Sequence, residues 1–122
     1  AYNNVVVTAD SNPRNLGAAF PNAPCHQLGA WTRYNFHRPH LGLGLGAEYV
    51  SPRLNFIEVD AFPASGYVIW DAALYYDLAR VQFTLRARNL FDRVYSQSTF
   101  GGRNGHFPGG PRAVSLTAAW RF

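Results

Sequence analysis

The stretch Arg112-Ala-Val-Ser-Leu-Thr-Ala-Ala-Trp-Arg-Phe122 decides the fold class, because apolar side chains recur in it at every second position. Trp120 and Phe122 belong to the apolar set, whereas Ser115 and Thr117 belong to the intervening set. A period of two residues is that of a β-strand, whose successive side chains point to opposite faces. The stretch therefore predicts a strand with one apolar and one mainly polar face.

Five earlier stretches also have the composition of β-strands, and together they predict an all-β chain with antiparallel, up-and-down connections. The six expected strands are residues 2–9, 26–34, 41–50, 66–77, 81–89 and 112–122. Most have roughly 9 to 11 residues, the length that crosses a bilayer when a strand is tilted. Long and short connections alternate along the chain, as they do in barrels of the bacterial outer membrane. The sequence therefore predicts a segment of a transmembrane β-barrel.

Composition and charge exclude several other classes of protein. No run of about 18 apolar residues is present, so no membrane-spanning helix is expected. All 11 basic residues are arginine, and the net charge of +4 is too diffuse for a nucleic-acid surface. Cys25 is the single cysteine, so no internal disulfide can form. His37 and His40 lack a third metal ligand nearby, and no catalytic arrangement stands out, so we expect no enzyme, cofactor or metal site.

The strand expected at residues 41–50 carries glycine at three successive positions of one face, Gly42, Gly44 and Gly46. Glycine inside a strand indicates the close approach of another group, because it leaves the space of a side chain empty. We therefore expect something bulky to lie against this face, or a crowded interior on this side of the sheet, rather than ordinary exposure to solvent.

Three motifs occur in order near the end of the chain, namely Asn89-Leu-Phe-Asp-Arg-Val-Tyr95, Gly109-Gly-Pro-Arg112 and the terminal Phe122. The ordered set resembles the carboxyl-terminal end of TonB-dependent outer-membrane receptors, in particular the siderophore receptors. That family shares an N-L-F-D-x-x-Y segment, a G-x-P-R entry into the last strand and a terminal Phe. The resemblance covers residues 66–122 well and residues 26–49 more loosely.

The resemblance implies a plugged barrel of about 22 strands, of which residues 1–122 are the carboxyl-terminal part without the plug domain. It implies the outer membrane of a Gram-negative bacterium as the location, with membrane lipid and the barrel assembly machinery as partners. The whole receptor would import a ferric siderophore or a similar metal chelate, using energy that the TonB complex passes to a missing amino-terminal region. Trp120 and Phe122 would carry the assembly signal, and an aromatic anchor at the membrane interface is the other interpretation, compatible with the first.

The resemblance also implies residues that contact the ligand, since the family holds anionic chelates with aromatic and arginine side chains. They are expected in the last two long connections and comprise Arg53, Phe56, Tyr95, Phe100, Arg103 and His106. For each of them, packing within the loop is the other interpretation. Tyr95 matches the motif tyrosine, which favours a structural role near the barrel rim.

One cross-strand pair follows from hairpin geometry. If Leu78 and Ala79 form a two-residue turn, Asp71 lies opposite Arg86 on the next strand. The two side chains would then form a structural ion pair on the polar face of the sheet.

The alternative hypothesis is a small soluble β-barrel that binds an apolar ligand inside. In such a barrel the apolar face fills the interior and the polar face meets water. The two hypotheses therefore differ in which face of the sheet is covered.

Overall fold

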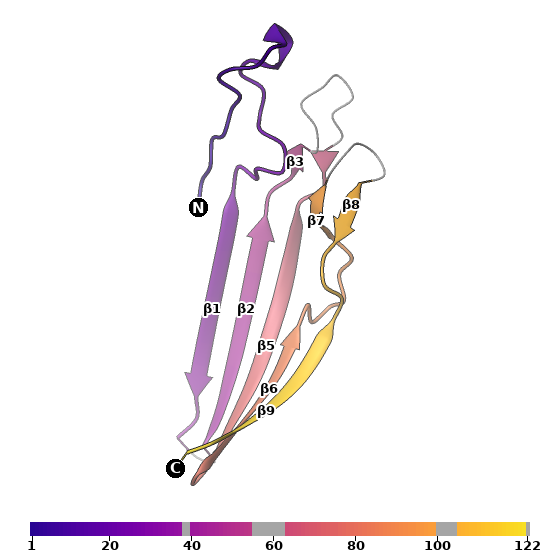
Figure 1. Ribbon diagram of the computed structural model, residues 1–122. Coiled ribbons are helices and arrows are strands. Elements are labelled where there is room, and N and C mark those ends of the chain that lie inside the picture. The colour runs from indigo at the N-terminus through magenta and orange to yellow at the C-terminus, as the bar shows by residue number, and fades with distance from the viewer. Residues whose placement is uncertain (38–39, 55–62, 100–104, 122) are drawn as a thin grey trace. The chain divides into compact units, whose positions relative to one another are not determined.

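The computed structural model describes residues 1–37, 40–54, 63–99 and 105–121, and its main feature is a five-stranded β-sheet. The strands are β1 (Gln27–Asn35), β2 (Leu41–Val50), β5 (Tyr67–Leu78), β6 (Val81–Arg88) and β9 (Ala113–Trp120). They are hydrogen-bonded in the order β1-β2-β5-β6-β9, and neighbouring strands run in opposite directions (Figure 1). Five of the six expected strands and their up-and-down order are thereby confirmed.

The long connections hold further short elements, which are η1 (Pro13–Asn15), β3 (Arg53–Leu54) paired with β4 (Pro63–Ala64), and β7 (Ser96–Thr99) paired with β8 (His106–Pro108). The chain divides into two compact units. A loop unit comprises residues 1–28, 49–68 and 94–109, and a sheet unit comprises residues 29–48, 69–93 and 110–122. Among the residues that the structure describes, no helix has the length and apolar composition needed to cross a membrane.

Residues 2–9 do not form the expected strand, so this prediction is wrong. They make only two isolated bridges, one between Tyr2 and His26 and one between Val6 and Ala19. The sequence separates no apolar side from a polar side here, and Val6 is 42% exposed. Without a face to bury, nothing favours a continuous ladder over a loop with local hydrogen bonds.

In the central strands β2 and β5 the apolar face of the sheet is the more exposed one, whereas the edge strands β1 and β9 are exposed on both faces. Large side chains of this face are open, from Leu43 (41%) and Trp70 (44%) to Leu116 (69%). Buried positions lie on the opposite face and include the three glycines of β2 and Ala73, which is 2% exposed. A barrel with an apolar interior needs the reverse arrangement. The exposed apolar face therefore contradicts the soluble-barrel alternative and suits a sheet that meets lipid.

The tight turn between β5 and β6 lies one residue later than expected. Leu78 pairs with Val81, so Ala79 and the following arginine form the turn, and Ala79 has a φ of +30°. This shift places Arg86 opposite Ala73 instead of Asp71, so the predicted cross-strand pair is wrong. Because the register moved by two residues, Asp71 and Arg86 still share one face. Leu78 extends the apolar alternation of β5 by one more step, and the expected turn did not take this signal into account.

Candidate functional site

The three glycines of β2 make room for two aromatic rings on the polar face. A Cβ atom added at Gly44 would lie 2.6 Å from the indole of Trp31 and 3.3 Å from the ring of Tyr75. A Cβ at Gly42 would lie 3.3 Å from Tyr75, and one at Gly46 would overlap the Trp31 ring. The expectation that something bulky approaches this face is confirmed. The bulky groups are side chains of β1 and β5.

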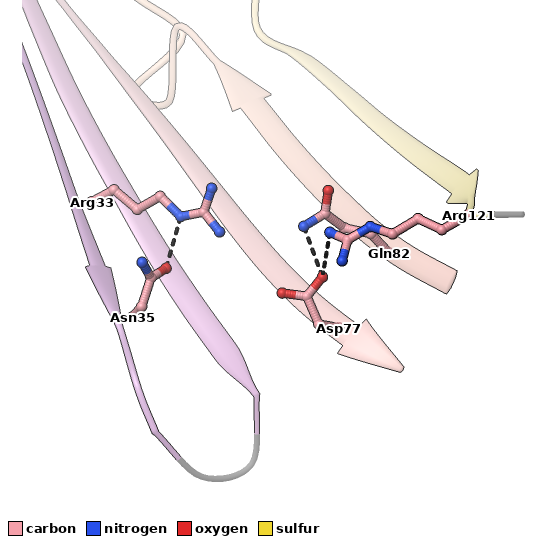
Figure 2. Close-up of polar contacts among 5 residues, drawn as sticks. All are labelled: Arg33, Asn35, Asp77, Gln82 and Arg121. Atoms are coloured by element: carbon pink, nitrogen blue, oxygen red, sulfur yellow. Dashed lines mark hydrogen bonds and ion pairs between the residues drawn. The ribbon is translucent and has the colours of Figure 1, made fainter. Parts of the chain in front are cut away.

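Two arginine side chains stack on these rings. The guanidinium carbon of Arg33 lies 3.9 Å from the centroid of the Tyr75 ring, and that of Arg86 lies 5.6 Å from the Trp31 ring. The Nε of Arg33 also donates a hydrogen bond of 2.8 Å to Oδ1 of Asn35 (Figure 2). At an exposed site each such stacking contributes about 0.5–1 kcal/mol. Trp31, Arg33, Tyr75 and Arg86 are called the aromatic-arginine cluster below.

A second polar group lies where β5, β6 and β9 come together. The Oδ1 of Asp77 accepts a hydrogen bond of 2.8 Å from Gln82 and forms an ion pair of 3.5 Å with Arg121 (Figure 2). The side chains of Arg121 and Asp77 are 66% and 41% exposed. Solvent screens such a pair, so it contributes at most about 1 kcal/mol. This ion pair was not predicted, because it depends on the register of three strands.

Asn89, the first residue of the N-L-F-D-x-x-Y motif, anchors the turn that follows β6. Its side-chain amide donates to the carbonyls of Arg93 (2.9 Å) and Gly110 (3.1 Å), and its Oδ1 accepts from the backbone N–H of Arg93 (2.8 Å). Its own backbone N–H donates to Asp71 at 3.0 Å. Asn89 is 4% exposed and has a φ of +49°, a conformation that asparagine tolerates better than most residues.

The rest of the motif also has structural contacts. In the sheet unit, Oδ1 of Asp92 accepts a hydrogen bond of 2.9 Å from the backbone N–H of Arg112, next to the start of β9. In the loop unit, the Tyr95 ring packs against the Tyr67 ring at a tilt of 43°, with centroids 4.5 Å apart. The same ring occupies the space where a side chain at Gly109 would lie, and the Gly109 N–H donates to the Tyr95 carbonyl at 2.8 Å. Asp92 and Tyr95 of the motif thus make contacts with residues of the Gly109–Arg112 segment, each within its own unit.

Arg53, expected to contact a ligand, is buried inside the loop unit. It is 7% exposed, and its Nη2 donates to the carbonyls of Ser96 (2.6 Å) and Gln97 (2.5 Å) on β7. Its guanidinium carbon lies 5.8 Å from the Tyr67 ring. These contacts tie β3 to β7 within the unit.

The other expected site residues divide into two groups. His106 is exposed, with Nδ1 3.4 Å from the hydroxyl oxygen of Ser96, and Trp120 is 61% exposed at the end of β9. Four lie outside the described residues, namely Phe56, Phe100, Arg103 and Phe122. In the described part of the chain, no three His, Cys, Asp or Glu side chains are grouped as metal ligands, and Cys25 is free and exposed.

Asn22 is a loop residue that the sequence did not single out. Its Oδ1 accepts from the backbone N–H (2.9 Å) and the hydroxyl (2.8 Å) of Thr99, which is 2% exposed. Its backbone N–H donates to the Leu54 carbonyl at 2.8 Å. Asn22 therefore joins the first long connection to β3 and β7. Its position after Pro21 indicated only a turn, because partners 77 residues away leave no local signal.

Comparison with known proteins gives consistent matches. The family model described as TonB dependent receptor-like, beta-barrel matches residues 1–90. The ferrichrome outer membrane transporter/phage receptor of Escherichia coli K12 is 33% identical over 129 residues, which cover 99% of this chain and 17% of the relative. The chain thus spans about a sixth of the length of that relative.

Solved structures resemble the chain as well. The closed form of the ferric-catecholate import receptor Fiu from E. coli K12 matches with a TM-score of 0.78 and 28% identity, over 88% of this chain and 16% of that one. The FrpB iron transporter from Neisseria meningitidis matches with a TM-score of 0.66 over 86% of this chain and 17% of that one, and at 19% identity it shows the fold alone. Because the family model covers well over half of its residues, the chain belongs to the family of TonB-dependent receptor-like β-barrels.

Proposed function

We propose that this chain forms the carboxyl-terminal part of the barrel wall of a TonB-dependent receptor that imports a ferric siderophore or a similar metal chelate. The likeness to a ferrichrome transporter at 33% identity carries the proposal. The exposed apolar face of the sheet is a structural observation that also supports the proposal. The family places the chain in the outer membrane, and its members are receptors and transporters rather than enzymes.

The two faces of the sheet give the wall its role. The apolar face, which includes Leu43, Trp70 and Leu116, meets the lipid, where a buried arginine would cost about 2–4 kcal/mol at the bilayer midplane. The polar face, with the aromatic-arginine cluster and Asp77, lines the interior of the barrel. The wall therefore separates lipid from a polar passage and performs no covalent chemistry.

Ligand capture belongs to the loops. His106, whose side chain is exposed, and the candidates Phe56, Phe100 and Arg103 would contact the chelate. Tyr95 and Arg53 would act indirectly, since their rings and guanidinium are engaged within the loop unit. The charge of Arg103 and the aromatic rings suit an anionic complex with apolar surface.

The remaining partners concern the whole receptor. Energy would come from the TonB complex through a region amino-terminal to this chain, where the plug domain would also lie. The barrel assembly machinery would recognise the end of β9 through Trp120 and Phe122, because an unpaired strand edge can add to another sheet. Trp120 would in addition anchor the wall at the membrane interface.

The test is uptake of radioactive iron by a Gram-negative strain that lacks its own chelate receptors and expresses the full-length receptor. Ferrichrome and ferric 2,3-dihydroxybenzoate serve as a hydroxamate and a catecholate probe. We expect accumulation of iron from at least one probe, and loss of accumulation in an otherwise identical strain without TonB. Equal accumulation with and without the receptor, for both probes, would contradict the proposal.

A further inference from the structure

The loop unit consists of three connections that are joined through buried side chains. They are called the first, second and third connection and comprise residues 1–28, 49–68 and 94–109. We propose that Asn22 and Arg53 form a clamp that makes the described parts of these connections one cooperative body, which opens as a whole rather than one connection at a time. This inference goes beyond the proposed function and does not depend on the cargo.

The clamp holds the backbone of β7 from two sides of the sequence. Nη2 of Arg53, in the second connection, donates to the carbonyls of Ser96 and Gln97. Nδ2 of Asn22, in the first connection, donates to the carbonyl of Thr99 at 2.5 Å. Oδ1 of Asn22 accepts from the N–H and the hydroxyl of the same threonine. The two side chains therefore bond three residues of a four-residue strand.

The contacts close a triangle, because each connection is bonded to both of the others. The first and second are joined by the hydrogen bond of 2.8 Å from the Asn22 N–H to the Leu54 carbonyl. The second and third are joined by the Arg53 guanidinium and by the Tyr67 and Tyr95 rings. The side chain of Asn22 joins the first to the third. Moving any one connection away therefore breaks contacts with the other two.

Burial makes it costly for one connection to leave alone. Arg53 is 7% exposed and Thr99 is 2% exposed. If only one partner moved away, the groups left behind would stay buried without their hydrogen bonds, which is the most unfavourable state for a polar group. A joint opening avoids this cost, because water then reaches both partners.

The elements of the connections are too short to be stable by themselves. In the described residues, η1 has three residues, β3 and β4 have two each, and β8 has three. Even a longer two-stranded hairpin is marginally stable in isolation. Each connection therefore depends on its contacts with the others, which is the condition for a shared opening. A ligand that binds only the closed form of one connection would then restrain all three.

The experiment is amide hydrogen exchange of the full-length receptor in detergent, without any chelate and in increasing urea below the unfolding transition. One amide reports on each connection, namely the N–H groups of Val7, Ser51 and Gly109, and each donates to a carbonyl outside the clamp. Amides in the middle of β5 show that the sheet is folded in every sample. Mass spectrometry with fragmentation to single amides gives the exchange rates.

The test variants remove the clamp and leave the backbone free to keep its conformation. Asn22→Gly suits the φ of +59° at this position, and Arg53→Met keeps an unbranched side chain of similar length. The matched control is Asp10→Ala in the first connection. It also removes three hydrogen bonds, but their donors all lie within residues 11–15.

In the unaltered receptor, the three reporters should converge on one urea dependence, because they report one opening. Asn22→Gly removes three hydrogen bonds and should speed the exchange of all three reporters about a hundredfold. Arg53→Met should speed all three at least about tenfold. The control should leave the Ser51 and Gly109 reporters unchanged.

Exchange that rises only in the connection carrying the substitution would overturn the inference, and so would an equal rise of all three reporters in the control. Three separate urea dependences in the unaltered receptor would overturn it even if a variant did not fold. The proposed function fails or stands separately. A receptor that imports no chelate leaves the exchange result standing, and connections that open independently leave the uptake result standing.

Discussion

Asn89 offers the sharpest test of how the motif works, because one buried side chain serves three backbone groups. Substitution by glycine removes the two donated and the one accepted hydrogen bond but keeps the backbone free to hold a φ of +49°. At about 1 kcal/mol for each bond, Asn89→Gly should destabilise the turn by about 3 kcal/mol. Asn89→Ala should cost about 1 kcal/mol more, since a Cβ atom strains this conformation.

Amide hydrogen exchange of the full-length receptor in detergent measures this local opening. The Arg93 N–H, which donates to Asn89, should exchange about a hundredfold faster in Asn89→Gly and about five- to tenfold faster again in Asn89→Ala. Amides in the middle of β5 should keep their protection in both variants. Protection of Arg93 that stays within about threefold of the unaltered protein, or an alanine variant more protected than the glycine variant, would refute the reasoning.

Three further predictions concern the faces of the sheet and one loop. Gly44→Val should lower the free energy of unfolding in urea by about 1–3 kcal/mol, because the indole ring against Gly44 must move. Gly29→Val should have little effect, because no atom lies within 4 Å of the added Cβ. Leu116→Arg on the apolar face should lower the yield of folded barrel in lipid vesicles. Thr117→Arg on the other face, where the residue lies opposite Thr84, should not, and equal yields would contradict the assignment of the faces. The carboxylate of Asp10 accepts hydrogen bonds from the backbone and the side chains of the residues that follow it, and these bonds hold its pKa below the usual value. The turn at Asp10 should therefore be stable above the usual pKa and should loosen as the pH falls through the lowered pKa. A carboxyl titration by NMR that gives an ordinary pKa would contradict this.

The strands and their faces were readable from the sequence, because the period of two residues is a local property of the chain. Five of the strands lie where the alternation predicted them. The glycines of β2 also predicted that bulky groups lie close to the polar face, and the structure identifies these groups as aromatic rings of β1 and β5. The order of the motifs indicated the family, and the match of the family model to residues 1–90 agrees.

The tertiary structure alone decided which side chains meet. The turn between β5 and β6 starts at Ala79 instead of Leu78, and this difference changes every pair of opposite residues in the two strands. The predicted contact of Asp71 changes with them. The partners of Asn22 and Arg53 lie 77 and 43 or 44 residues away, beyond the reach of any local pattern. A strand's side chains are sorted into two faces by its own backbone, but their neighbours across the sheet depend on register, which the turns and the packing of several strands set together.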